Sequence, residues 1–206
     1  MDTPGLKNSP VERAKSVFRK KGGLLRMSHA LQAGIHRNTL RVMVEQGELE
    51  KLSRGLYQLA DAEPLSHPDL AVVAEKAPEG VICLISALAF HELTTQIPHE
   101  VYLAIARNAE PPRIDYPPVR SFRFSGAAFT EGIETHELGP VTLRVYSRAK
   151  TLADCFKFRN KIGLDTCLEA LRSYRQQRGF TSDTLLQYAA VCRVTNVMRP
   201  YIEAVL

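Results

Sequence analysis

The sequence predicts an α+β fold in two parts: a small helical domain that ends in a β-hairpin, and a larger domain with a mixed sheet that ends in several helices. Three observations support this prediction. Apolar residues recur at helical spacing over residues 11–46, and two short strand-like segments follow. β-branched and aromatic residues concentrate in residues 81–146. Helical spacing then returns from residue 151 onward.

The composition fits either one large globular domain or two modest ones, with 206 residues, 45% of them apolar and 24% charged. Pro64 and Pro68 flank a change in charge character. We therefore expect a first domain of residues 1–60, a linker at 61–67 and a second domain of residues 68–206.

The cysteines and the apolar runs exclude several classes of protein. The four cysteines are far apart in sequence, which is not the spacing of a disulfide framework or a zinc ribbon. No secretory signal is visible, and no apolar run reaches the roughly 18 residues of a membrane span. We expect a cytoplasmic protein with no membrane contact.

The positive charge is confined to the N-terminal part. Residues 1–60 hold 11 Lys and Arg against 5 Asp and Glu, whereas residues 61–206 hold 16 against 17. Such an excess is typical of a domain that binds phosphates, because neutralised phosphates release counterions. A solvated basic surface explains the charge equally well.

The first domain is expected to begin with two helices. "VERAKSVFRKKGG" has helical spacing and stops at Gly22 and Gly23. "MSHALQAG" then predicts a shorter helix, with Ser28 as its N-cap and Gly34 in the left-handed conformation that ends helices.

A third helix, expected over residues 37–46, has two different faces. Its apolar face comprises Leu40, Met43 and Val44, and its opposite face comprises Asn38, Arg41, Val42 and Glu45. A helix, a glycine-containing turn and a second helix can place that second helix in the major groove of DNA, where Arg pairs with guanine and Asn with adenine. A helical hairpin with a solvated face fits the three helices equally well.

A basic hairpin after the third helix favours DNA binding. In "ELEKLSRGLYQLA", two short strands can pair across a turn at Ser53, Arg54 and Gly55. Lys51, Ser53 and Arg54 lie at this turn or beside it, where they can reach phosphates or a minor groove. Three helices and a basic hairpin together predict a winged helix-turn-helix domain.

The second domain is expected to begin with a helix at Pro68 and a buried strand, "EGVICLI", after which Ser86 would cap the next helix. Four further strands are predicted from "EVYLAIA", "VRSFRFS", "GIETHEL" and "VTLRVYS". Gly139 and Pro140 separate the last two as a hairpin. A mixed sheet is expected.

The C-terminal quarter is expected to be helical. Thr151 and Asp154 have the spacing of a capping box, which predicts a helix N-terminus there. In the next helix, "LDTCLEALRSYRQQRG", Arg172, Arg175 and Arg178 share one side, and we interpret that stripe as a solvated face rather than a binding site.

Three segments in this order resemble the AbiEi family of type IV toxin-antitoxin antitoxins: "AGIHRNTLRVMVEQGELEKLSRGLYQL", "LISALAFHELTTQIPHEVYLAI" and "YSRAKTLADCFKFRNKIGLD". The resemblance implies a transcriptional regulator that binds double-stranded DNA of its own promoter region and represses its operon. It also implies an antitoxin that counters a nucleotidyltransferase-like toxin, either directly or through a shared target.

The resemblance also implies which residues bind DNA. The matching positions on the third helix are Arg37, Asn38, Thr39 and Arg41, and those on the wing are Lys51 and Arg54. The later segment contains Lys150, Thr151 and Asp154, to which we assign no chemical role.

No catalytic motif is recognised. No Asp or Glu has a Lys two positions later, as a metal-dependent nuclease would need, and no phosphate-binding glycine loop, nucleophile elbow or H-E-x-x-H pair is present. His91 and His99 are expected to be packing or surface residues rather than metal ligands. We expect no enzyme activity, cofactor or metal. The alternatives are a protein-interaction module without sequence-specific DNA binding and a DNA-associated nuclease with an unrecognised site.

Overall fold

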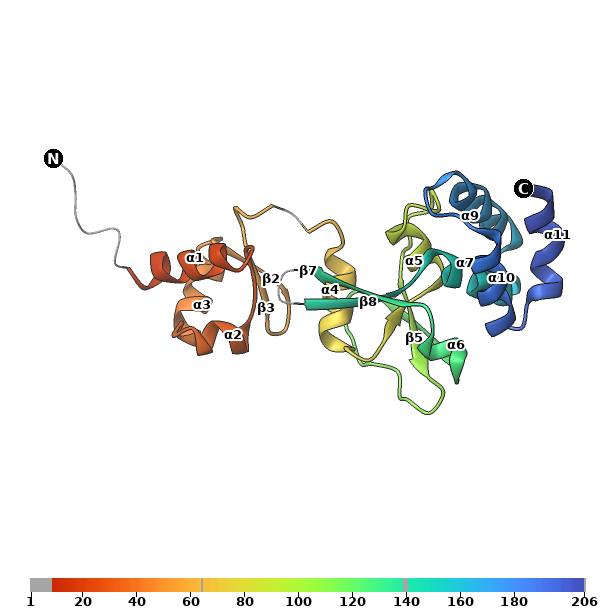
Figure 1. The fold of residues 1–206 in the computed structure, drawn as a ribbon. Helices are drawn as coiled ribbons and strands as arrows, with labels where there is room; N and C mark the ends of the chain where they lie inside the picture. Colours follow the sequence, from red (N-terminus) through yellow and green to blue (C-terminus); the bar gives the residue numbers. More distant parts are fainter. Residues whose placement is uncertain (1–8, 64, 139–140, 206) are drawn as a thin grey trace. The chain divides into compact units, whose positions relative to one another are not determined.

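The computed structural model describes residues 9–63, 65–138 and 141–205 (Figure 1). It contains two compact units. The first extends to Val72 and includes the described part of residues 137–142, and the second contains the remainder from Val73. The α+β class is confirmed, with a helix-turn-helix-like region at the N-terminus and a sheet with helices after it. The domain limits and the linker at 61–67 stay predictions, and Pro64 lies outside the described residues.

The first unit contains helices α1 (Pro10–Lys20), α2 (Met27–Gln32) and α3 (Arg37–Glu45) and strands β1 (Leu24–Arg26), β2 (Leu49–Ser53) and β3 (Leu56–Leu59). The three helices and the β2–β3 hairpin were predicted. β1 was not predicted, because three residues are too few for a recognisable alternation. It pairs antiparallel with β3, which gives a sheet of order β1-β3-β2.

The core of this unit confirms the apolar face predicted for α3. Leu40 and Met43 are buried against Phe18 of α1 and the sheet, and Val44 is half-buried beside them. On the other face Asn38, Arg41 and Glu45 are exposed, and Val42 is half-buried. The helical periodicity therefore predicted correctly which face of α3 packs against the rest of the unit.

Two local predictions in this unit were wrong. Ser28 does not cap α2, because the helix already begins at Met27 and Arg26, the last residue of β1, stands at the N-cap without a side-chain bond. Ser53 belongs to β2, so the turn is Arg54-Gly55. Gly34 has φ +83°, the left-handed conformation predicted for it.

After β3 in the sequence the chain forms α4 (Pro68–Lys76), which starts at the predicted proline. The second sheet contains β4 (Val81–Ile82), β5 (Val101–Ala106), β6 (Val119–Phe124), β7 (Ile133–Leu138) and β8 (Val141–Tyr146). Its order is β6-β5-β4-β8-β7. β4 is antiparallel to β5 and parallel to β8, and β5 is parallel to β6, so the predicted mixed sheet is confirmed. Gly139 and Pro140 lie outside the described residues.

The strand predicted from "EGVICLI" is short, because Cys83 is already the N-cap of α5 (Leu84–Phe90). Ser86, predicted as the cap, is instead buried inside this helix. Its hydroxyl accepts a hydrogen bond from the Tyr102 amide at 2.9 Å and donates to the Glu100 carbonyl at 3.4 Å. Ser86 therefore connects α5 to the start of β5.

The remaining helices are α6 (Ala127–Thr130), α7 (Arg148–Lys157), α8 (Arg159–Ile162), α9 (Leu164–Gln176), α10 (Ser182–Val191) and α11 (Thr195–Val205). α7 is buried from Ala149 to Phe156 and is covered by α5, α9 and α10 (Figure 1). It is the central helix of the second core. No described helix has both the length and the apolar character that crossing a membrane requires.

Two C-terminal predictions were wrong. Ser147 caps α7, so Thr151 and Asp154 do not form a capping box; both lie inside the helix and are fully buried. Arg178 lies beyond the end of α9, so the three arginines do not share one helix face. The Arg175 Nε donates to the Val205 carbonyl at 3.0 Å.

Candidate nucleic-acid interface

The turn between α2 and α3 sets the direction of α3. After Gly34 the chain turns inward at Ile35, which is 6% exposed and whose amide donates to the Ala30 carbonyl at 3.0 Å. α3 then begins at Arg37, with His36 at the N-cap. One buried side chain and one hydrogen bond thus connect the second helix to the third.

The exposed face of α3 carries three of the predicted DNA-reading residues. Arg37, Asn38 and Arg41 are exposed, whereas Thr39 is half-buried. Thr39 lies in a groove of about 330 Å³ between α1 and the α2–α3 turn; its lining also includes Pro10, Arg13, Val17, Gly34 and His36. Arg37, Asn38 and Arg41 therefore project outward, and Thr39 borders the groove behind them.

Arg41 has an acidic neighbour one turn later. Its Nε lies 3.6 Å from a Glu45 carboxylate oxygen, and the two side chains are 71% and 63% exposed. Exposed pairs at this spacing contribute about 0.3–0.5 kcal/mol. Arg41 can therefore leave Glu45 for a stronger acceptor at small cost.

The hairpin positions the wing residues beside the start of α2. The Gly55 carbonyl accepts a hydrogen bond of 2.7 Å from the Met27 amide, and Gly55 itself has φ +93° in the turn. Lys51 and Arg54 are exposed. Ser53 is half-buried, and its hydroxyl oxygen is buried with no hydrogen-bond partner in the described part of the chain.

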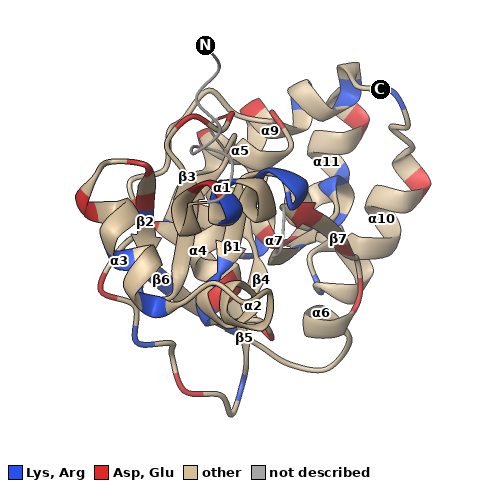
Figure 2. Ribbon diagram, turned by 90° about the vertical axis from the view of Figure 1, so that its left-hand side faces the viewer, with Lys and Arg blue, Asp and Glu red and all other residues tan. Residues whose placement is uncertain are grey.

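Part of the positive charge on α1 is neutralised within the unit. The Lys15 ammonium lies 2.6 Å from Glu48 and 3.6 Å from Glu12. The Arg19 guanidinium donates to the Asp61 carboxylate at 2.7 Å, and this hydrogen bond lowers the pKa of Asp61. Arg37 and Lys51 have no ion pair with any carboxylate that the structure describes. Figure 2 shows the Lys and Arg positions on α1 and α3.

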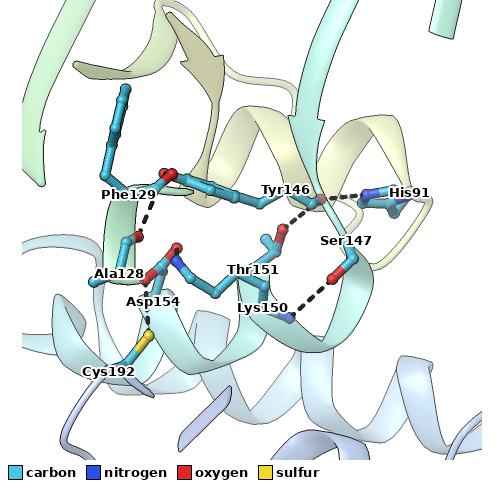
Figure 3. Close-up of polar contacts among 9 residues, drawn as sticks. All are labelled: His91, Ala128, Phe129, Tyr146, Ser147, Lys150, Thr151, Asp154 and Cys192. Atoms are coloured by element: carbon cyan, nitrogen blue, oxygen red, sulfur yellow. Dashed lines mark hydrogen bonds and ion pairs between the residues drawn. The ribbon is translucent and has the colours of Figure 1, made fainter. Parts of the chain in front are cut away.

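A buried polar cluster in the second unit was not predicted (Figure 3). The Lys150 ammonium lies 2.6 Å from Asp154 Oδ2, and the Cys192 thiol donates to Asp154 Oδ1 at 3.1 Å. The same ammonium is 3.9 Å from the centroid of the Tyr146 ring. The i,i+4 spacing of Lys150 and Asp154 was the available signal. The sequence instead suggested a cap formed by Thr151 and Asp154, because sequence does not show how deeply a helix is buried.

The polar groups around the Lys150–Asp154 pair are also hydrogen-bonded to other groups of the protein. The Tyr146 hydroxyl donates to the Phe129 carbonyl at 2.8 Å, and the Tyr146 carbonyl accepts bonds from Thr151 Oγ1 at 3.0 Å and His91 Nε2 at 2.7 Å (Figure 3). Burial raises the pKa of Asp154 and raises that of the Cys192 thiol to about 12. A thiol with that pKa stays protonated and unreactive. We interpret the cluster as structural.

The other residues considered as metal ligands are not clustered. His91 is buried against Tyr146 and His99 is exposed, so the two histidines occupy different environments. Among the described residues, no group of three or more His, Cys, Asp or Glu side chains could hold a metal ion. All four cysteines are free and buried.

Comparison with known proteins agrees with this geometry. Residues 12–60 match the model of a family described as "Transcriptional regulator, AbiEi antitoxin". The N-terminal segment is therefore similar to this regulator family. The resemblance inferred from the residues is thereby confirmed for α1 to β3, and the family match ends at residue 60.

A solved structure extends the likeness in fold. The crystal structure of RV2827C protein from Mycobacterium tuberculosis matches with a TM-score of 0.60 and 14% sequence identity, over 89% of this chain and 72% of that chain. At this identity the match shows the fold alone. No curated protein matches the sequence.

Proposed function

We propose that the N-terminal unit binds double-stranded DNA of the protein's own promoter region and represses its operon. The observation that carries this proposal is α3, which follows a glycine turn and projects Arg37, Asn38 and Arg41 away from the core. A helix presented in this way can lie in the major groove. The regulator family matched by residues 12–60 supports the same function.

The exposed residues divide into two roles under this proposal. Asn38 and Arg41 contact bases, because an amide and a guanidinium each form two hydrogen bonds with a base edge. Lys51 and Arg54, on the hairpin, contact the phosphate backbone. Arg37, at the first position of α3, and Thr39 complete the site, and Ser53 would contribute only if its buried hydroxyl became accessible.

We further propose that the protein acts in the cytoplasm as the antitoxin of a type IV toxin-antitoxin system. It would counter a nucleotidyltransferase-like toxin, directly or through a shared target, without catalytic activity of its own. The family description of the N-terminal match and the resemblance of the two later segments support this proposal.

The test is titration of the full chain with a fluorescent duplex of the protein's own upstream region and with a scrambled duplex. We expect tighter binding to the upstream region and weaker binding as salt rises. Arg41→Ala should cost about 1–3 kcal/mol of discrimination at one base pair, whereas Arg54→Ala should weaken binding to both duplexes alike. Lys20→Ala, on α1, is the matched control. Equal affinity for both duplexes, or no binding, would reject the regulator and favour a protein-interaction module.

A further inference from the structure

Three cations of the second unit gather over one group of aromatic rings, and we name Arg120, Lys157 and Lys161 the basic cluster. Arg120 on β6 lies 5.6 Å from the centroid of Phe122, and Lys161 on α8 lies 5.8 Å from the same centroid. Lys157, the last residue of α7, lies 5.9 Å from Phe124. Three elements thus contribute one exposed cation each.

The rings beneath the basic cluster form a continuous layer. Phe122 and Phe158 meet edge to face at 5.2 Å, Tyr102 stacks on Phe122 at 5.6 Å, and Phe124 lies 5.5 Å from Phe158. The parallel register of β5 and β6 pairs Tyr102 with Arg120, so the Tyr102 ring lies at the edge of this layer next to Arg120. Arg120 and Lys161 therefore share the Phe122 ring, and Lys157 lies over Phe124 in the same aromatic layer.

The charge of the basic cluster is largely uncompensated. Arg120 lies 3.3 Å from Glu100, but Lys157 and Lys161 have no ion pair with any described carboxylate. On α1, in contrast, both Lys15 and Arg19 are paired with carboxylates. A ring face attracts a cation without neutralising it. The aromatic layer therefore positions positive charge that remains available to an external anion.

We propose that the basic cluster is a second nucleic-acid surface, which contacts the phosphate backbone without reading sequence. Tyr102, Phe122 and Phe124 are only 8%, 5% and 3% exposed and Phe158 is half-buried, so the layer offers little aromatic surface to a protein partner or for base stacking. Affinity then comes mainly from charge, and a row of phosphates supplies repeated negative charge. The surface belongs to the second unit and does not depend on the function proposed for the first.

The test measures how binding of the full chain to a scrambled 24-base-pair DNA duplex depends on salt. The triple variant Arg120→Gln, Lys157→Gln, Lys161→Gln should lower the slope of log K against log salt by roughly 2–3, because each lost phosphate contact contributes about 0.9. The matched control is Arg172→Gln, Arg193→Gln, Arg199→Gln, which removes the same charge from exposed positions elsewhere in the unit. It should change the slope by less than about 1.

Further variants and binding probes distinguish the possible explanations of a changed slope. Lys157→Arg with Lys161→Arg should keep the wild-type slope, which distinguishes loss of charge from loss of folding. A larger effect on RNA of the same length would identify RNA as the source of the phosphates. Equal slopes for the two triple variants would overturn the proposal. Binding of poly-L-glutamate as tight as that of DNA, lost in the same variant, would also overturn it. The ratio of affinities for promoter and scrambled duplex should not change, so failure of this proposal and failure of promoter recognition give different results.

Discussion

Lys150 and Asp154 form an ion pair of 2.6 Å in which both side chains are completely buried (Figure 3). Water solvates neither group, so each charge depends on the other and on nearby polar groups. Cys192 donates to the second carboxylate oxygen, and the Tyr146 ring faces the ammonium. Breaking such a pair costs more than forming it contributes, because removal of one partner leaves a buried charge uncompensated.

Lys150→Met should therefore lower the free energy of unfolding by about 3–5 kcal/mol. The double variant Lys150→Met, Asp154→Leu should recover much of this loss, because neither charge remains. Urea denaturation measures both effects. The matched control is Arg41→Met, which breaks the exposed i,i+4 pair with Glu45 and should cost no more than about 0.5 kcal/mol. A Lys150→Met protein as stable as wild type would show that Asp154 is neutral or hydrated in the native state.

Gly132 is required by the close approach of Lys150. A Cβ at residue 132 would lie 2.7 Å from the Lys150 Cβ and 2.9 Å from its Cγ, and Gly132 has φ +73°. Gly132→Ala should therefore lower the midpoint of thermal unfolding and destabilise the protein by about 2–5 kcal/mol from strain and overpacking together. Gly179→Ala, with φ +86° and open space around its Cβ, isolates the backbone contribution. Equal effects of the two substitutions would mean that the Lys150 side chain moves aside easily.

His91 should make stability depend on pH. Burial lowers its pKa, an effect that Arg148 and His136 reinforce and that the Tyr146 carbonyl and Glu134 oppose. The folded pKa lies below the unfolded value of about 6.5, so the unfolded chain binds the proton more readily. The stabilisation is present above that value and is lost as pH falls through the folded pKa. His91→Gln keeps a donor for the Tyr146 carbonyl and should reduce the fall in unfolding free energy between pH 7 and 5. His99→Gln, at an exposed site, should leave that fall unchanged.

Glu45 should restrain DNA binding through Arg41. Glu45→Ala releases Arg41 from an ion pair worth about 0.3–0.5 kcal/mol and removes a negative charge from the face proposed to meet DNA. We expect affinity for the upstream duplex to rise about twofold or more, as measured by fluorescence anisotropy. Glu63→Ala makes the same change in net charge at another exposed position of the unit. An equal rise for both variants would assign the effect to net charge alone.

Sequence patterns predicted most elements because each pattern reports a local preference. Leu40 and Met43 have the spacing of a helix, and both are buried as that spacing requires. Gly34 ends α2 in the left-handed conformation that glycine tolerates best. The DNA-binding roles of Asn38, Arg41, Lys51 and Arg54 remain predictions, but the structure places all four at exposed positions.

Patterns failed where a residue's role depends on a distant partner. Ser86 has the composition of a helix cap, yet it bonds to Tyr102 on a strand that the fold brings beside its helix. Arg120 and Lys161 are 41 positions apart, and only the tertiary structure places them over the same ring.

The sequence alone thus determined most of the elements, their approximate limits and the polar face of α3, because these follow from spacing within a few residues. The tertiary structure decided that α7 is buried, that Lys150 needs Asp154, and that three cations share an aromatic layer. Those outcomes follow from the strand order β6-β5-β4-β8-β7 and the helices packed around α7, which depend on contacts between distant segments.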